Sequence, residues 1–457
     1  MENQGSGLQK SLSKWSVLSM GLGCVIGWSW IIYAGYWGSV PGTFGGVLAF
    51  VIAGLLCSFV GLVYAELTAA FPRAGGDVVF VFQGLGEKAA ILAGWCIMLL
   101  WTGLIMIEAM MLPVIMTGLG IAIPKWGYLW EFAGGTVYLS YFLVTLAVNL
   151  FFAYINYRGA EISGKFQTAS VFILLVAAIF FFLSGVSLGD PQNVKPLFTG
   201  ASGLTLVMLM VPGFLSGFNA VPQIAEEANM PPNAVGRAVV LAVWGSVLFY
   251  ILIIVGLSFS APIEVRSAEG LAVVNGIHHL FKGSTAAAGF VTFAALLGML
   301  TTWNAAYVAA SRLMVGLSRA KFIPGNFHEI HSQYGTPYKA IWTLFFVSTL
   351  WALVGTSQVI YVGIVNVSSF FLIIAWATVI ISFMRLRKKQ PDLERPYRVP
   401  FYRFIYWSSC DTLQYRLSTT VYSFESKRWI DYWGNDCCSN NILNDYNLYR
   451  PVEFTRG

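Results

Sequence analysis

The feature that most constrains this chain is an apolar run from about residue 15 to residue 33 that contains Gly21, Gly23 and Gly27. The run is long enough to cross a bilayer as a helix, which takes about 20 residues. Inside lipid every backbone N–H and C=O needs a partner, so a spanning helix can open at these glycines only where the freed groups face protein, water or a ligand. The run therefore predicts a broken membrane helix.

A second stretch, Pro212–Pro222, has the same character, with the sequence PGFLSGFNAVP. Two interrupted spans in corresponding positions of the two halves of a chain indicate a transporter site near the membrane midplane. The alternative is that the glycines only let neighbouring helices pack closely. The occurrence of two matching interruptions favours the binding site.

The composition indicates that most of the chain lies in a membrane. Of its 457 residues, 57% are hydrophobic and only 11% are charged, whereas soluble domains carry about 25% charged residues. The apolar runs have helical length and do not alternate, which predicts an all-α polytopic membrane protein. The spans expected before Arg385 are, approximately, 15–35, 44–70, 89–115, 136–155, 167–187, 203–225, 235–259, 286–310, 340–356 and 358–384.

The basic residues predict the orientation of these spans. With the N-terminus in the cytoplasm, most lysines and arginines before the tail fall in cytoplasmic connections, which normally carry such an excess. The net charge of +6 is then explained by the loops and gives no reason to expect a nucleic-acid partner. The outer connections hold only Lys125, Lys195, Arg266 and Lys282.

Five spans followed by five, with the first and the sixth broken, predict a 5+5 inverted repeat, because a second copy of an odd-numbered unit inserts upside down. The expected parts are a cytoplasmic N-terminal segment (1–14), a first repeat (15–187), a second repeat (203–384), a basic cytoplasmic loop (385–403) and a polar tail (404–457). The apolar segment 271–282 is too short to span and is expected to form an interfacial helix or a loop over the pocket.

Short motifs occur in a fixed order along the chain: Gly21–Gly27, Tyr64–Gly76, Asn156–Gly159, Gly213–Glu227, Trp303–Arg312 followed by Phe322–Pro324, and Arg395–Pro400. In this order they resemble the amino acid–polyamine–organocation superfamily, which has the LeuT-type fold. The resemblance covers about residues 12–403. It implies an amino acid permease or exchanger of the plasma membrane, a secondary transporter that works by alternating access and uses no cofactor.

The chemistry of helix ends explains how two breaks could hold a zwitterion. A helix N-terminus offers free N–H groups to a carboxylate, and a C-terminus offers carbonyls to an ammonium. The first break would offer carbonyls at Gly23–Val25 and amides near Gly27–Ser29, and the second would offer carbonyls at Gly213–Leu215 and amides near Gly217–Phe218. The resemblance carries substrate binding over to Val25, Ile26, Gly27, Phe214, Ser216 and Gly217. The full expected set is Gly23, Val25, Ile26, Gly27, Trp28, Ser29, Gly213, Phe214, Ser216, Gly217 and Asn219.

Two departures from the family's pattern bear on substrate and coupling. Where the family often has Gly-Ser-Gly, this chain has Gly27 followed by Trp28. Trp28 would either narrow the pocket or turn into lipid, and the Gly-Trp pair resembles the ethanolamine-permease branch. Some proton-coupled relatives carry a lysine in the fifth span where Leu174 stands here, so lysine-mediated proton coupling is not expected.

Polar residues within the spans have candidate roles. Asn219 would support the second break or contact the substrate, and Phe214 would gate the pocket or simply pack. Glu108, the one ionisable residue well inside the third span, is a functional candidate by its position, unless it reaches water at the outer end of its helix. The remaining candidates are Thr301, Thr302 and Asn304, which could ligate a cation with the carbonyl of Val25, and Glu226, Glu227 and Arg237, which would form a cytoplasmic salt-bridge gate.

The residues favour transport over the other functions of membrane proteins. The sequence shows neither a paired nucleophile and base nor a Cys/His cluster with metal spacing, so neither catalysis nor a metal site is expected. A channel would show a polar stripe along a pore-lining helix, which no span has. The apolar lining and the absence of acidic residues at the breaks favour a neutral amino acid, with H⁺ or Na⁺ as the candidate co-transported ion. The alternative substrate is a small amine such as ethanolamine, which lacks a carboxylate.

Residues 404–457 do not continue the family's pattern, which has two further apolar spans. No window of about 18 residues in this tail is free of charge. Either a soluble tail follows the tenth span, or a frameshift has replaced two helices with out-of-frame residues. Translating the coding DNA in the other two frames distinguishes these explanations, because only the frameshift leaves two apolar runs in another frame.

Overall fold

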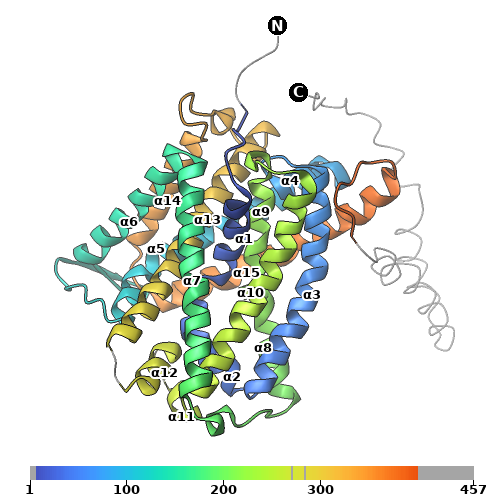
Figure 1. Cartoon of the computed structure of the whole chain (residues 1–457). Coiled ribbons are helices and arrows are strands. Elements are labelled where there is room, and N and C mark those ends of the chain that lie inside the picture. The colour runs from blue at the N-terminus through green and yellow to red at the C-terminus, as the bar shows by residue number, and fades with distance from the viewer. Residues whose placement is uncertain (1–6, 269–270, 283–284, 400–457) are drawn as a thin grey trace, which may run out of the picture. The chain divides into compact units, whose positions relative to one another are not determined.

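The computed structural model describes residues 7–268, 271–282 and 285–399, so the expectations for residues 1–6 and for the tail 404–457 lie outside the described part of the chain. Helices dominate the described residues (Figure 1). They are α1 (Lys14–Ile26), α2 (Ser29–Ser39), α3 (Thr43–Ala70), α4 (Gly76–Leu85), α5 (Glu87–Gly118), α6 (Leu139–Arg158), α7 (Ala160–Leu188), α8 (Ala201–Phe214), α9 (Ala220–Gln223), α10 (Pro232–Ser260), α11 (Ile263–Arg266), α12 (Ala272–Leu280), α13 (Thr285–Arg319), α14 (Tyr338–Ala352) and α15 (Gln358–Lys389), with 3-10 turns η1 (Pro191–Val194), η2 (Ser216–Asn219), η3 (Ala225–Glu227) and η4 (Gly325–His328).

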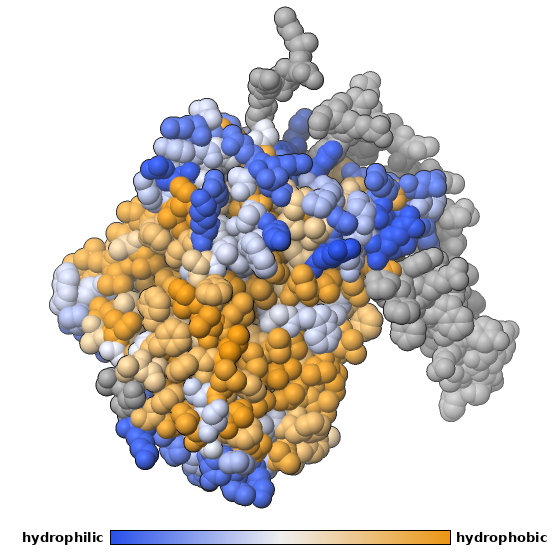
Figure 2. Space-filling view, in the orientation of Figure 1, coloured by the Kyte–Doolittle hydropathy of each residue, from blue (hydrophilic) through white to orange (hydrophobic). Residues whose placement is uncertain are grey.

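The helices present an apolar belt between two hydrophilic ends (Figure 2). In the described residues, eight helices are long and apolar enough to cross a membrane, or nine when the bent pair α1 and α2 counts as one span. The predicted all-α polytopic membrane fold is therefore confirmed, while the 5+5 inverted repeat stays a prediction. The span expected at 340–356 is shorter than predicted. Its helix, α14, has only 15 residues, which is about 22 Å at 1.5 Å per residue.

The first helix break lies where the glycine pattern predicts it. Ser13 caps α1 by accepting a hydrogen bond from the N–H of Ser16 at 3.2 Å. Helix α1 ends at Ile26 because Gly27 has φ 52° and ψ −143°, a backbone conformation that residues with a side chain rarely adopt. Helix α2 begins at Ser29 and is bent by 57° from α1.

The second break is a change of helix type. Helix α8 contains Pro212 and ends at Phe214, and the chain continues through η2 into the short helix α9. At this point a Cβ on Gly217 would lie 2.5 Å from the backbone of Cys24 and Val25. The two breaks therefore meet backbone to backbone, beside helices α7, α10 and α13, which pack around α1 (Figure 1).

Three smaller elements flank these spans. Helix α12 confirms the short helix predicted at 271–282. Helix α4 and an antiparallel hairpin of β1 (Tyr128–Phe132) and β2 (Gly135–Tyr138) are not predicted by the sequence patterns. The fully buried Asp77 of α4 accepts hydrogen bonds from the Tyr64 hydroxyl and, at 2.6 Å, from Nε2 of Gln223. These bonds connect α4 to α3 and to the C-terminal end of the second break.

Candidate functional site

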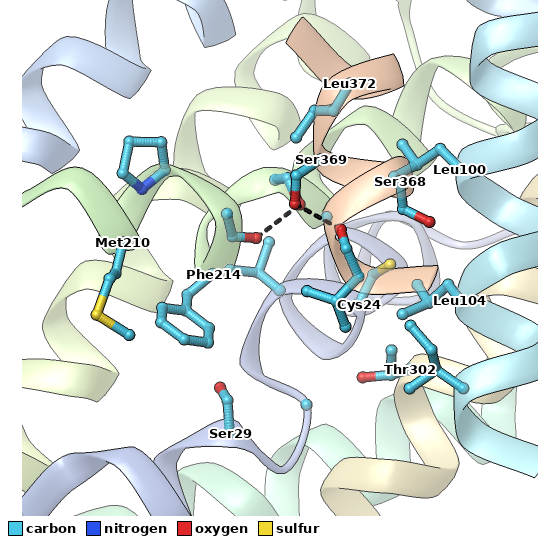
Figure 3. A pocket seen from close by; sticks show the side chains of 18 of the residues that line it. Cys24, Ser29, Leu100, Leu104, Met210, Phe214, Thr302, Ser368, Ser369 and Leu372 are labelled. Atoms are coloured by element: carbon cyan, nitrogen blue, oxygen red, sulfur yellow. Dashed lines mark hydrogen bonds between the residues drawn. The ribbon is translucent and has the colours of Figure 1, made fainter. Parts of the chain in front are cut away.

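A cavity of about 600 Å³ lies between the two breaks. Figure 3 shows Phe214 and Met210 of α8 on one side of it and Leu100 and Leu104 of α5 on the other. Its volume falls in the range of about 300–1,000 Å³ that is typical of small-molecule sites. Among the residues singled out from the sequence, those that line it are Val25, Gly27, Trp28, Ser29, Glu108, Gly213, Phe214, Ser216, Gly217, Asn219 and Thr302.

The carbonyls of the first break are already hydrogen-bonded to side chains. The hydroxyls of Thr301 and Thr302 each lie 3.2 Å from Gly23 O and also lie 2.8 and 3.2 Å from Gly298 O, so their protons are shared between the two carbonyls. The Tyr250 hydroxyl, from α10, lies 2.8 Å from Val25 O and 3.0 Å from Ile26 O. Trp30 Nε1 donates to Gly27 O at 3.1 Å. These side chains occupy part of the acceptor capacity of the carbonyls that α1 leaves at its C-terminus, and the binding of an ammonium there stays a prediction.

Trp28 turns into the cavity and not into lipid. Its Nε1 donates to Oε2 of Glu108 at 3.1 Å. The Glu108 side chain is 1% exposed, so the expectation that it could reach water at the end of its helix is wrong for this structure. An acidic residue thus lies at the first break, so a neutral substrate is no longer favoured by an absence of acidic residues there.

The second break contributes an amide, an aromatic ring and a hydroxyl to the cavity wall. The Asn219 side chain is fully buried, and in the described structure neither its Nδ2 nor its Oδ1 has a hydrogen-bond partner. Phe214 packs on Tyr33 and Trp37 with ring centroids 5.3 and 4.9 Å apart. The hydroxyl of Ser216 donates to Gly213 O at 2.9 Å. Asn219 therefore has unused donor and acceptor capacity inside the cavity.

The expected cation site at Val25 stays a prediction. Asn304 belongs to a buried network, in which its Oδ1 accepts from Asn156 and Ser163 at 2.9 Å and its Nδ2 donates to Gln167 at 2.8 Å. Nε2 of Gln167 in turn donates to Thr301 O at 3.1 Å. Tyr250 and Gln167 are not among the residues predicted from the sequence, although a hydroxyl and an amide within long apolar spans are a signal that buried polar contacts must exist.

The predicted salt bridges at the inner end of the second break form with different partners. Glu227 pairs with Arg312, with an N–O distance of 2.7 Å and both side chains almost completely buried. Glu226 pairs with Arg319, also at 2.7 Å. In the described part of the chain Arg237 forms an ion pair with neither glutamate, so its predicted place in this cluster is wrong.

The electrostatic environment of Glu226 follows from this pairing. Burial works to raise the pKa of its carboxyl, but the hydrogen bonds and positive charge of Arg319, with the N–H groups of Ala74 and Leu8, lower the pKa below its ordinary value. The contact is therefore intact at neutral pH and weakens as the pH falls through the lowered pKa.

Comparison with known proteins gives matches over most of the chain. Residues 12–413 match the family described as amino acid permease. The methylthioribose transporter of Bacillus subtilis (strain 168) is 26% identical over 419 residues, which cover 88% of this chain and 86% of the relative. The branched-chain amino acid permease BcaP of the same organism is 26% identical over 86% of this chain and 84% of its own. The aspartate-proton symporter of the same organism is 25% identical over 93% of this chain and 84% of the symporter.

Proposed function

The chain belongs to the amino acid permease family, and from this premise we propose that it moves an amino acid or a small related amine by alternating access around the two helix breaks. The family and the similar proteins support a transporter of amino acids or related substrates, and not an enzyme. The observation that supports alternating access around the two breaks is the cavity of about 600 Å³ that both breaks line. The residues proposed to bind the substrate are those of the two breaks that line this cavity.

The substrate class follows in part from the cavity and in part from the relatives. The relatives' names mention methylthioribose, branched-chain amino acids and aspartate, so membership of the family leaves the choice of substrate to the residues of the site. We propose an amino acid as the substrate, with a small amine such as ethanolamine as the alternative. The proton symporter among the relatives supports H⁺ as a candidate coupling ion, with Na⁺ as the other.

The rest of the proposal concerns orientation and gating. The excess of basic residues on one side supports a cytoplasmic N-terminus in the plasma membrane. The two ion pairs Glu227–Arg312 and Glu226–Arg319 join the end of the second break to α13. We assign them the role of the cytoplasmic gate, which opens only when α13 and the second break move apart.

Uptake by purified protein in proteoliposomes tests this proposal. Labelled amino acids and amines are supplied singly, each with and without a Na⁺ gradient and a pH gradient. The proposal expects saturable, protein-dependent uptake or exchange of at least one of them. If no amino acid or amine in the panel is taken up under any gradient, the proposed function is refuted.

Replacing Gly27 with leucine is expected to abolish this uptake while the protein still inserts in the membrane. Gly27 lines the cavity with φ 52°, and its Cβ would lie 3.0 Å from Oγ1 of Thr302. A leucine would strain the backbone and extend into the substrate's space. The matched control is Gly363→Leu on α15, where a Cβ would have no atom within 4 Å. Normal uptake by Gly27→Leu would exclude a substrate site at the first break.

A further inference from the structure

The wall of the cavity contains a buried acidic residue, Glu108, which has few hydrogen-bond partners and no partner of opposite charge among the described residues. The Glu108 side chain is 1% exposed and lines the cavity. Within the described residues, the carboxylate of Glu108 accepts one hydrogen bond, which the indole N–H of Trp28 donates. Glu108 takes part in none of the ion pairs between these residues. A carboxylate has about four acceptor positions. A buried carboxylate that stays charged is strongly unfavourable unless a partner of opposite charge is present, and a cationic group on the occupant of the cavity would be such a partner.

The other acceptors at the first break are less available to that charge. Gly23 O accepts from two threonine hydroxyls, Val25 O and Ile26 O share the hydroxyl of Tyr250, and Gly27 O accepts from Trp30. An ammonium group that approached these carbonyls would share them with the protein donors that already occupy one of their two lone pairs. At Glu108 it would instead gain a charge-assisted hydrogen bond, which is roughly twice as strong as a neutral one.

The cavity also holds polar donors that lack acceptors. Asn219 is fully buried with both polar atoms unpartnered in the described structure. The indole N–H groups of Trp101 and Trp376, whose side chains line the same cavity, are likewise without a partner there. Unpaired buried donors are rare in native structures and call for an explanation. Oxygen atoms on the ligand would accept hydrogen bonds from these N–H groups.

We propose that Glu108 binds the ammonium group of the transported substrate, so that an amine is the required part of the ligand and a carboxylate is dispensable. The inference rests on the proposed transport function and names the group that the site recognises. Trp28 positions the carboxylate of Glu108, and Asn219 with the two indoles receives the ligand's oxygen atoms. Amines without a carboxylate are therefore ligands, and acids without an amine are not.

Thermal stabilisation of the purified full chain tests which group is required. The probes are two matched sets: leucine, 3-methylbutylamine and 4-methylpentanoate, and alanine, ethylamine and propionate, with ethanolamine and methylthioribose beside them. The inference expects stabilisation by amine-bearing probes and none by the two acids or by methylthioribose. Binding of an amine-free probe as strong as that of its amine counterpart overturns the inference and leaves the transport function standing. Failure of all amine-bearing probes in both stabilisation and uptake refutes the transport function as well.

Substitution of Glu108 tests whether its carboxylate binds the ammonium group of the ligand. In Glu108→Gln the affinity for amine-bearing probes is expected to fall by about tenfold to a hundredfold, as for loss of a charge-assisted hydrogen bond. The matched control is Glu87→Gln, the same change on an exposed residue of the same helix, which should leave affinity unchanged. Unchanged amine affinity in Glu108→Gln overturns the inference.

Discussion

Replacing Gly217 with alanine is expected to abolish transport, although it adds only one methyl group. The new Cβ would lie 2.5 Å from the carbonyl carbon of Cys24 and from the nitrogen of Val25, and 2.8 Å from Cys24 O. These neighbours are backbone atoms of the other break, so no side-chain rotation can relieve the contact. The two breaks would have to separate by about 1 Å, and displacements of that size can reduce rates in active sites by about a hundredfold.

The measurement is the initial rate of uptake per molecule of reconstituted protein. The control is Gly289→Ala on α13, where a Cβ would have no atom within 4 Å and alanine favours the helix. Gly289→Ala should insert and transport like the unmodified protein. Equal uptake by Gly217→Ala would contradict the close backbone contact between the two breaks.

Replacing Arg312 with methionine is expected to destabilise the folded protein strongly. Its guanidinium donates to Glu227 through Nε at 2.7 Å and through Nη2 at 3.0 Å, and both side chains are almost completely buried. Arg312→Met would leave the Glu227 carboxylate buried without its partner, which costs about 3–5 kcal/mol. A lower melting temperature of the purified protein in detergent is the expected result.

Two further variants separate the charge effect from loss of packing. In Glu227→Gln combined with Arg312→Met no buried charge is left, so much of the lost stability should return. Lys165→Met removes an exposed ion pair with Glu161, and exposed pairs contribute only about 0–1 kcal/mol. An Arg312→Met protein that melts like the unmodified one would show that the buried pair does not hold the second break to α13.

The positions of the two breaks could be predicted because their causes are local. Gly27 adopts a positive φ, and Pro212 lies in the last turn before α8 ends, so the residues that interrupt the helices are visible in the sequence. The length of the apolar runs likewise predicts most of the spans. Helix α14 is the exception, since its run continues beyond Ala352 in sequence but not in helical structure.

The contacts that complete the site could not be predicted because they join distant parts of the chain. Arg237 is the nearest basic residue after Glu227 in sequence, but the partner in space is Arg312 of α13. Tyr250 reaches the carbonyls of α1 from α10. The depth of Glu108 within its span was visible, but whether its side chain faces water or the cavity depends on how α5 packs against the other helices.

Protection of a single cysteine by substrate tests the central claim, that the substrate occupies the cavity between the breaks. Ser216 lines this cavity, and Ser216→Cys is made in a chain whose six cysteines are replaced. The labelling rate with N-ethylmaleimide is measured in proteoliposomes at increasing concentrations of the amino acid or amine that is taken up best, with Ser202→Cys, exposed at the start of α8, as the control. The account predicts that labelling of Ser216→Cys slows with a midpoint at the concentration that half-saturates uptake, while labelling of Ser202→Cys does not change. Labelling of Ser216→Cys at an unchanged rate under saturating substrate would contradict it.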